Sequence, residues 1–268
     1  MKVKTIKLYL AGIKSYQLDL GIECSAFLDP HLERTIQGIK RDHGEPDRRI
    51  RTPLTRPHLL RILQHLPHRN YDTIVTRAAF TLAFAGFLRV GEFTYSEKDR
   101  ELGATFGNWF LTKGSVRIPR SGSYMELTLP SSKTDPFRRG IKLTIAASQD
   151  EACAVQAMKG LQAIDTHRPQ WAPLFCIGRA EQLPFTRGHV VQKLQRLAIT
   201  AGMGHGSWNG HSSRRGAATW AAEAGISDTE IETLGRWKSD AYMRYIEYST
   251  KECISRSRRF QGRQCHTT

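Results

Sequence analysis

The stretch NGHSSRRGAATWAAEAGISDTEIETLGRWKSDAYMRYIEY, residues 209–248, decides how this 268-residue chain is interpreted. It opens with His211 and Arg214. Their i, i+3 spacing puts both side chains on one face of a helix that begins there. The two side chains can then converge on a single oxyanion.

Two helices are predicted after this pair. The first is alanine-rich and apolar and stops at Gly225. The second starts where Ser227 and Glu230 have the spacing of a capping box, and it runs toward Leu234.

Aromatic residues follow the second helix. Trp237 comes two residues after Gly235, and Tyr242, Tyr245 and Tyr248 recur at i, i+3 and i+6. Such a run offers a phenolic nucleophile beside a basic pocket that contains an indole.

The composition favours a polyanionic partner. Lys and Arg number 40 against 25 acidic residues, which gives a net charge of +15 and a pI near 9.9. A basic but merely solvated surface is the alternative. The length allows one large domain, or one with a small companion, and a hydrophobic content of 40% is enough for a core.

The cysteines indicate a reducing compartment, and the apolar runs predict no membrane span. The five cysteines are odd in number, scattered and without a C-x-x-C pair, so neither a disulfide framework nor a zinc site is predicted. The longest apolar run, residues 78–88, is far shorter than the roughly 20 residues that span a bilayer. The N-terminus lacks a signal-peptide core. We therefore expect a soluble, intracellular protein with no membrane contact and no metal.

The N-terminal part is predicted to be small and helical. Residues 1–44 have two amphipathic stripes, and the Gly, Pro and Arg content of residues 42–53 is typical of a linker. A domain boundary near residue 52 follows.

A buried helix is predicted to begin at Asp72 and to carry the run TRAAFTLAFAGFLRVGEF. This helix delivers Arg89, with Glu92 three residues later. A guanidinium that emerges from a buried helix is costly unless it meets an anion. Alternatively, Arg89 stabilises the C-terminal end of its own helix and pairs with Glu92.

Residues 115–146 alternate between apolar and polar side chains and predict a three-stranded antiparallel meander. The second turn holds Lys133, Arg138 and Arg139. A lysine in a hairpin turn is ordinarily solvated. Further helices are predicted over residues 150–164 and 186–201, and the glycine loop that follows them lacks the ending of a nucleotide-binding P-loop.

Together these motifs resemble a known signature. H-x-x-R at His211, G-x-W at Trp237 and M-R-Y-I around Tyr245 look like the C-terminal signature of the tyrosine recombinases, the DNA breaking and rejoining family of phage integrases. The segments GHSSRRGAATWAA and LGRWKSDAYMRYIEY are most similar to recombinases of eukaryotic DIRS and Crypton-type mobile elements. This resemblance implies an α+β fold, mainly helical with a small three-stranded antiparallel sheet, preceded by a truncated helical core-binding region.

The resemblance also implies a set of site residues. In the family, Arg89 of GFLRVGE is the first of two phosphate-clamping arginines, Glu92 supports it, and Lys133 of SSKTD is the hairpin lysine. The catalytic set, in family order, is Arg89, Lys133, His211, Arg214, Trp237 and Tyr245. Arg138, Arg139 and Arg215 are expected to contact DNA.

The implied reaction moves a phosphoryl group between oxygen nucleophiles without a metal, ATP or any other cofactor. Arg89 and Arg214 would hold the nonbridging oxygens. Tyr245 would attack and form a 3′-phosphotyrosyl link, with His211 as the base. Lys133 would protonate the departing 5′-oxygen.

Trp237 has only an N–H to offer, so it would hydrogen-bond a phosphate oxygen and pack the tyrosine helix. The M-R-Y-I context favours Tyr245 as the nucleophile, whereas Tyr242 and Tyr248 would pack or face solvent.

The domain prediction has three parts: a partial core-binding region and linker at 1–51, a catalytic domain at 52–250 and a basic tail at 251–268. We expect a nuclear site-specific recombinase or integrase of a mobile element, acting on double-stranded DNA as a homo-oligomer, without a nucleotide. Two alternatives stay open: a non-catalytic DNA-binding remnant, and relaxation of DNA in the manner of a type IB topoisomerase.

Overall fold

The computed structural model describes residues 3–44, 52–67, 70–131, 139–237, 242–243, 246, 253–254 and 257–258. The chain divides into two compact units, Met1–Ile50 and Arg51–Thr268, and each unit is described by itself.

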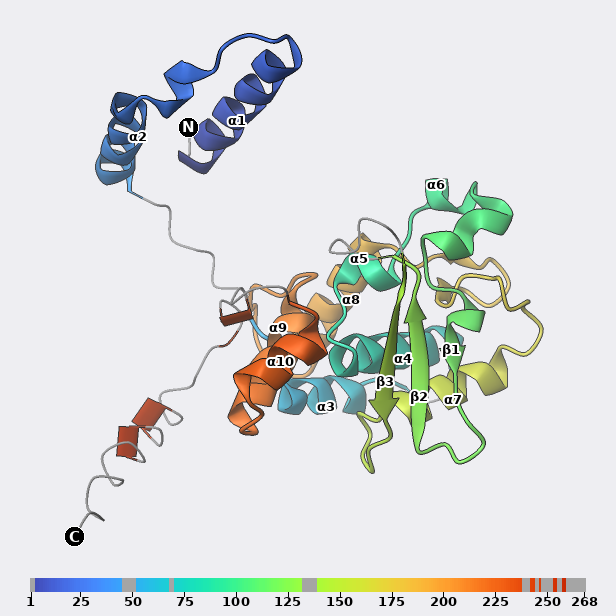
Figure 1. The fold of residues 1–268 in the computed structure, drawn as a ribbon. Helices are drawn as coiled ribbons and strands as arrows, with labels where there is room; N and C mark the ends of the chain where they lie inside the picture. Colours follow the sequence, from blue (N-terminus) through green and yellow to red (C-terminus); the bar gives the residue numbers. More distant parts are fainter. Residues whose placement is uncertain are drawn as a thin grey trace. The chain divides into compact units, whose positions relative to one another are not determined.

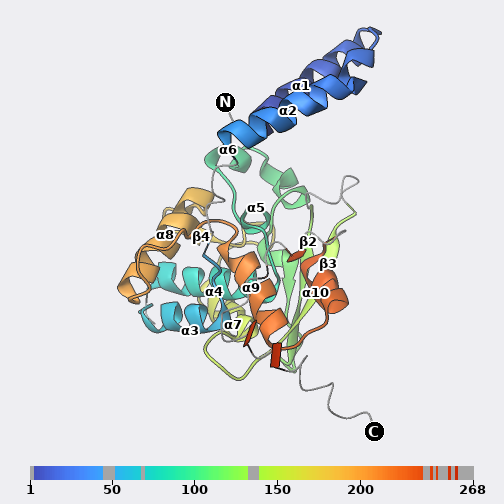
Figure 2. The same cartoon turned by 90° about the vertical axis from the view of Figure 1, so that its left-hand side faces the viewer.

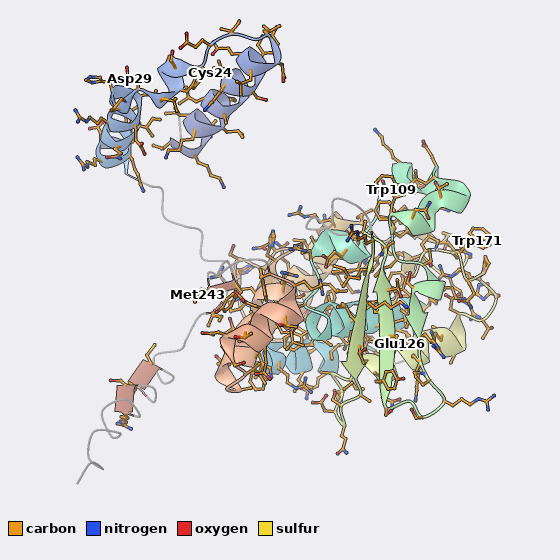
Figure 3. The ribbon with its side chains drawn as sticks, in the orientation of Figure 1. Cys24, Asp29, Trp109, Glu126, Trp171 and Met243 are labelled. Carbon is orange, nitrogen blue, oxygen red and sulfur yellow. The ribbon has the colours of Figure 1, made fainter. Side chains whose placement is uncertain are left out.

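The first unit contains the two predicted helices, α1 (Val3–Asp19) and α2 (Pro30–His43), joined through a short 3₁₀ turn, η1 (Ser25–Leu28) (Figure 1). Asp29, labelled in Figure 3, caps α2 by accepting a 2.8 Å hydrogen bond from the backbone N–H of His31. Within this pair Ile36 is the buried residue of α2, and α1 buries none of its side chains.

The second unit contains the remaining elements. In chain order the larger ones are α3 (Arg56–Gln64), α4 (Tyr71–Ala85), α5 (Val90–Phe93), α6 (Glu97–Arg100), β1 (Val116–Arg117), β2 (Tyr124–Leu129), β3 (Ile141–Ala146), α7 (Ala154–Ile164), β4 (Cys176–Ile177), β5 (Leu183–Pro184), α8 (Arg187–Thr200), α9 (Ser212–Glu223) and α10 (Asp228–Gly235). The 3₁₀ turns η2 (Gly103–Asn108) and η3 (Lys113–Ser115) lie between α6 and β1. This fold is mainly helical with small antiparallel sheets, as predicted.

Helix α4 is the centre of this unit because it is apolar nearly all round. It packs against α7 and α9, and α9 packs in turn against α10 (Figure 2). Ten of the residues of α4 are buried, including Phe80, Leu82 and Phe84. Arginines next to α4 therefore lie beside an apolar interior.

The predicted extent of α4 was wrong at both ends. The N-cap is Asn70, whose side chain accepts from the N–H of Asp72 at 2.9 Å, while the carboxylate of Asp72 accepts from the N–H of Gly178. The helix ends at Ala85, and α5 is a separate turn of helix. Arg89 is therefore not at the C-terminal end of its own helix but is the N-cap residue of α5.

The predicted meander is confirmed. Strands β1, β2 and β3 pair antiparallel in that order, with Val116 opposite Leu127 and Leu127 opposite Leu143. Met125, Leu127 and Leu129 are buried on one side of β2, as the period of two requires, and β3 packs on α7.

Two details of the following segment differ from the prediction. Helix α7 begins at Ala154, capped by Cys153, four residues later than expected. The connection before α8 contains the two-stranded sheet β4–β5, whose strands are too short to show a period of two. Thr186 caps α8 as predicted, accepting from the N–H of His189 at 3.1 Å.

Over the described ranges, no helix combines the length and apolarity needed to cross a membrane. The same ranges contain no group of three His, Cys, Asp or Glu side chains arranged to hold a metal ion.

Candidate active site

The turn between α4 and α5 places Arg89. The backbone of Phe87 is left-handed, with φ of 49°, and it turns the chain so that the N–H of Leu88 bonds back to the carbonyl of Ala83 at 2.9 Å. Glu92 then accepts from the backbone N–H of Arg89 at 2.8 Å and from its Nη1 at 2.9 Å. The predicted Arg89–Glu92 pair is confirmed, with the Arg89 side chain 21% exposed and that of Glu92 only 5%.

A second arginine shares the same carboxylate. Nη2 of Arg236 donates to Oε2 of Glu92 at 2.8 Å, and its Nη1 donates to the carbonyl of Gly86 at 2.9 Å. Burial lowers the pKa of Arg236; Glu92 opposes this shift and the neighbouring Arg89 adds to it.

A third arginine joins the turn after α4 to the end of α10. Arg214, on the first turn of α9, is buried, and its Nη1 and Nη2 donate to the carbonyls of Phe87 and Gly235. Its guanidinium also lies 4.3 Å from the centre of the Trp237 ring, a cation–π contact. The end of α4 and the end of α10 are thus joined through the arginine that α9 supplies.

Trp237 is held in place by small neighbours and aromatic rings. A Cβ on Gly235 would overlap the indole, so the glycine permits this packing. Phe87 meets the indole edge to face with centroids 6.1 Å apart, and Tyr242 lies 6.0 Å away on another side. Tyr242 is buried, so of the two predicted environments, packing or solvent, the structure has packing.

The start of α9 is fixed against the rest of the unit. His211 is its N-cap residue, and its backbone N–H bonds to the side-chain oxygen of Asn209 at 2.9 Å. A Cβ on Gly216 would overlap the carbonyl of Leu54, whose own N–H bonds to the carbonyl of Ser212 at 2.9 Å. Residues 52–55 therefore hold the helix that carries Arg214.

The structure thus brings together Arg89, Glu92, Arg214 and Trp237 from three separate parts of the sequence, with His211 three residues before Arg214. Arg215 follows Arg214 and is half-buried, and Arg139 is exposed just before β3. Three predicted site residues, Lys133, Arg138 and Tyr245, lie outside the described residues.

Sequence reasoning missed Arg236. A hint was present in its position directly after the last residue of α10, where a left-handed backbone and therefore a glycine are common. Arg236 has φ of 56° there, and its partners Gly86 and Glu92 are about 150 residues away in sequence.

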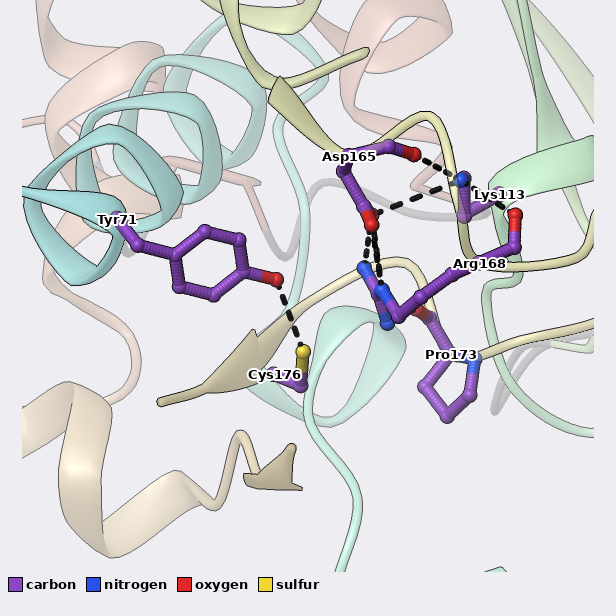
Figure 4. A network of polar contacts seen from close by, with 6 residues as sticks. All are labelled: Tyr71, Lys113, Asp165, Arg168, Pro173 and Cys176. Carbon is purple, nitrogen blue, oxygen red and sulfur yellow. Dashed lines mark hydrogen bonds and ion pairs between the residues drawn. The ribbon is translucent and has the colours of Figure 1, made fainter. Parts of the chain in front are cut away.

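A second buried arginine network lies elsewhere in the unit (Figure 4). Arg168 binds Asp165 through its Nε at 2.8 and 2.9 Å and through Nη2, and its Nη1 donates to the carbonyl of Pro173 at 2.8 Å. Lys113 donates to the carbonyls of Asp165 and Arg168 and pairs with the Asp165 carboxylate at 3.7 Å.

Close by, the hydroxyl of Tyr71 lies 3.1 Å from the sulfur of Cys176. Burial, followed by this bond, raises the pKa of Tyr71, and burial also raises that of Cys176. Both groups are therefore held neutral at physiological pH, and neither is poised as a nucleophile.

Known proteins share this architecture. The Tn1549 transposon integrase in complex with a circular intermediate DNA superposes with a TM-score of 0.55 at 14% identity, over 97% of this chain and 80% of that one. XerA recombinase gives 0.53 at 13% identity, over 94% and 73%. The fold is that of the tyrosine recombinase catalytic domain.

The sequence is also similar to an integrase/recombinase xerD homolog of Selenomonas ruminantium, with 25% identity over 223 residues, which is 82% of this chain. The chain spans 60% of the length of that relative. No protein-family profile matches the sequence. The similarity in sequence and the shared fold support the tyrosine recombinase and integrase family.

Proposed function

We propose that the chain is a site-specific DNA recombinase, or the catalytic part of one, which cuts and rejoins double-stranded DNA as a homo-oligomer. The observation that carries this proposal is that Arg214, stacked on Trp237, bonds to the carbonyl of Phe87 in the turn that leads to Arg89 and its partner Glu92. The net charge of +15 suits a DNA partner. Proteins of similar fold include the XerH site-specific recombinase bound to palindromic difH substrate and the Tn1549 transposon integrase in complex with a circular intermediate DNA.

In this mechanism the two guanidiniums stabilise the charge that develops on the nonbridging oxygens in the pentavalent transition state. Arginine suits this task because it stays protonated and presents a planar fork of donors. Trp237 contributes by stacking on the guanidinium of Arg214, which limits the orientations that the fork can take.

The bond changes follow the family resemblance. The phenol oxygen of Tyr245 forms a bond to phosphorus while the bond from phosphorus to the 5′-oxygen breaks. His211 takes the phenol proton, and Lys133 gives a proton to the departing 5′-oxygen. The 3′-phosphotyrosyl link conserves the energy of the broken bond, so the proposal requires neither ATP nor a metal.

Finer features of the proposal rest on the sequence. The sequence of residues 209–248 supports an origin in a DIRS or Crypton-type mobile element, and with it action in a nucleus. Residues 1–51 would be part of a core-binding region, residues 52–250 the catalytic domain, and the basic residues of 251–268 a tail that contacts DNA or a neighbouring protomer. Arg138, Arg139 and Arg215 would add contacts to DNA phosphates.

The test is covalent trapping on supercoiled and nicked DNA, with protein-linked DNA measured on a denaturing gel. We expect a link with the wild type and with Tyr242→Phe, and none with Tyr245→Phe. Tyr242→Phe is the matched control, because Tyr242 is a buried tyrosine three residues away that packs against Trp237.

Other outcomes separate the alternatives. Salt-sensitive DNA binding without any link would favour the non-catalytic remnant. A link accompanied by relaxation of supercoiled DNA at no defined site would favour the topoisomerase activity. A link that survives in Tyr245→Phe would contradict the assignment of the nucleophile.

A further inference from the structure

We infer that Arg236 is a positioning residue, which holds Arg89 ready for a phosphate oxygen by sharing the Glu92 carboxylate with it. The inference rests on the proposed function only in taking a phosphate as the ligand of Arg89.

Glu92 is the link between the two arginines. Its Oε1 accepts from Nη1 of Arg89, and its Oε2 accepts from both the backbone N–H of Arg89 and Nη2 of Arg236. With three donors on two oxygens, the carboxylate is held in one orientation, and so is the Nη1 edge of the Arg89 guanidinium. Within the described residues, Nε and Nη2 of Arg89 have no protein partner, and they remain for a ligand.

Arg236 is anchored at its other nitrogen. Its Nη1 donates to the carbonyl of Gly86, in the turn that leads to Arg89. The side chain is 8% exposed, and both of its terminal nitrogens are bonded to protein groups. Arg236 therefore acts on Arg89 through Glu92 and through the turn at residues 86–89.

The backbone of Arg236 gives an independent argument. Helices α1, α8 and α9 end in a left-handed residue that is closed by a six-to-one hydrogen bond, and in each of them that residue is glycine: Gly21, Gly202 and Gly225. Helices α4 and α10 end in the same closure, but their left-handed residues are Phe87 and Arg236.

A left-handed backbone disfavours any residue with a Cβ, and glycine would satisfy the helix end without strain. The two exceptions are the two turns that Arg214 joins. At Arg236 the side chain that replaces glycine reaches Glu92 and Gly86, which is consistent with strain accepted at a functional site.

These observations suggest a variant that separates positioning from folding. Arg236→Gly removes the guanidinium but gives the helix end its preferred residue, so the fold is expected to keep its melting temperature to a good approximation. Arg236→Lys keeps a charge but offers a single ammonium, which cannot reach Glu92 and Gly86 with the geometry of the fork. Glu92→Gln tests the shared carboxylate itself.

The experiment follows the Nε–Hε NMR signal of Arg89, assigned with Arg89→Lys, during titration with inorganic phosphate. In the wild type we expect a saturable shift. In Arg236→Gly the apparent Kd for phosphate should rise at least fivefold. The Kd of Arg236→Lys should lie between those of the wild type and Arg236→Gly. Combining Glu92→Gln with Arg236→Gly should raise the Kd little beyond that of either single variant. The control is Arg168→Met, which removes a buried arginine from the other network and should leave the phosphate Kd unchanged below its melting temperature.

An unchanged phosphate Kd in folded Arg236→Gly would overturn the inference, and so would a wild-type Arg89 signal that does not respond to phosphate. A parallel covalent-link assay distinguishes the two proposals. If Arg236 controls phosphate binding at Arg89 but the wild type forms no link with DNA, the proposed recombinase activity fails and the positioning role stands.

Discussion

Two networks of buried arginines lie in the same unit, and they are built differently. In the first, Asp165 serves Arg168 and Lys113, and all three side chains are at most 9% exposed. In the second, Glu92 serves Arg89 and Arg236, and the Arg89 side chain is 21% exposed. The first network is closed by protein groups, whereas the second has an edge that reaches solvent.

The pKa values of Arg168, in the closed network, and Arg236, in the open network, shift in opposite directions. Burial lowers the pKa of Arg168, but the hydrogen bond to Asp165 and the charges of Cys176, Tyr71 and Asp165 together outweigh burial, and the net shift is upward. Burial also lowers the pKa of Arg236; there Glu92 opposes the shift, the second cation Arg89 adds to it, and the net shift stays downward. An excess of positive charge around one carboxylate is unfavourable by itself and becomes favourable when an anion such as phosphate binds.

Breaking the closed network should give the largest loss of stability. Within the described residues, Arg168→Met leaves the buried Asp165 carboxylate paired with Lys113 alone. Removing one partner of a buried ion pair costs about 3–5 kcal/mol. Urea unfolding would measure this loss. The rate of covalent link formation per folded molecule should not change, and a rate loss in the folded fraction would show that the two networks are coupled.

Removing Arg214, which joins the turn before Arg89 to the end of α10 beside the open network, should affect the reaction. Arg214→Met removes a donor from the transition state and is expected to slow the link by about 10²–10³-fold at saturating DNA. Single-turnover kinetics on DNA that the wild type cleaves would measure this effect. A variant that folds and keeps the wild-type rate would remove Arg214 from the phosphate site.

A pair of glycine substitutions compares the helices that lead into the two networks. Gly216→Ala in α9 forces a Cβ into the carbonyl of Leu54, and such overpacking costs about 1–3 kcal/mol. Gly160→Ala in α7 meets no atom within 4 Å and should stabilise the fold by about 0.5–1 kcal/mol. Urea unfolding of both variants checks the sign, and equal effects would contradict the close approach of α9 to Leu54.

The smallest effect concerns pH. Ser227 lowers the pKa of Glu230 through side-chain and backbone hydrogen bonds at the start of α10. A lowered pKa in the folded state adds stability that is present above the usual glutamate pKa and is lost as the pH falls through the lowered value. In Ser227→Ala the free energy of unfolding should therefore fall less steeply as the pH is lowered through the acid range. An acid limb identical to that of the wild type would show that the cap contributes nothing.

Much of the fold is predictable from local patterns. The alternation in residues 115–146 gives the meander, and Ser227 with Glu230 forms the predicted capping box. These features are predictable because the residues that determine them lie within a few positions of one another.

The rest depends on backbone geometry that the pattern does not carry. The apolar run after Asp72 continues past Ala85, so nothing in its period reveals that Phe87 turns left-handed and ends α4. The direction of the Arg236 side chain likewise follows from φ of 56° and from partners at Gly86 and Glu92. A family motif can suggest Arg89 and Arg214, but only the three-dimensional contacts reveal what holds them.

We propose that the open network is a phosphate site and not a second structural network. The direct measurement compares single-turnover link formation by Arg89→Met with that by Arg100→Met. Arg100 pairs with Glu97 at the same i, i+3 spacing but on the surface, so it is the matched control. We predict a loss of about 100-fold or more for Arg89→Met and a wild-type rate for Arg100→Met. Equal rates for the two variants would contradict a phosphate site at Arg89.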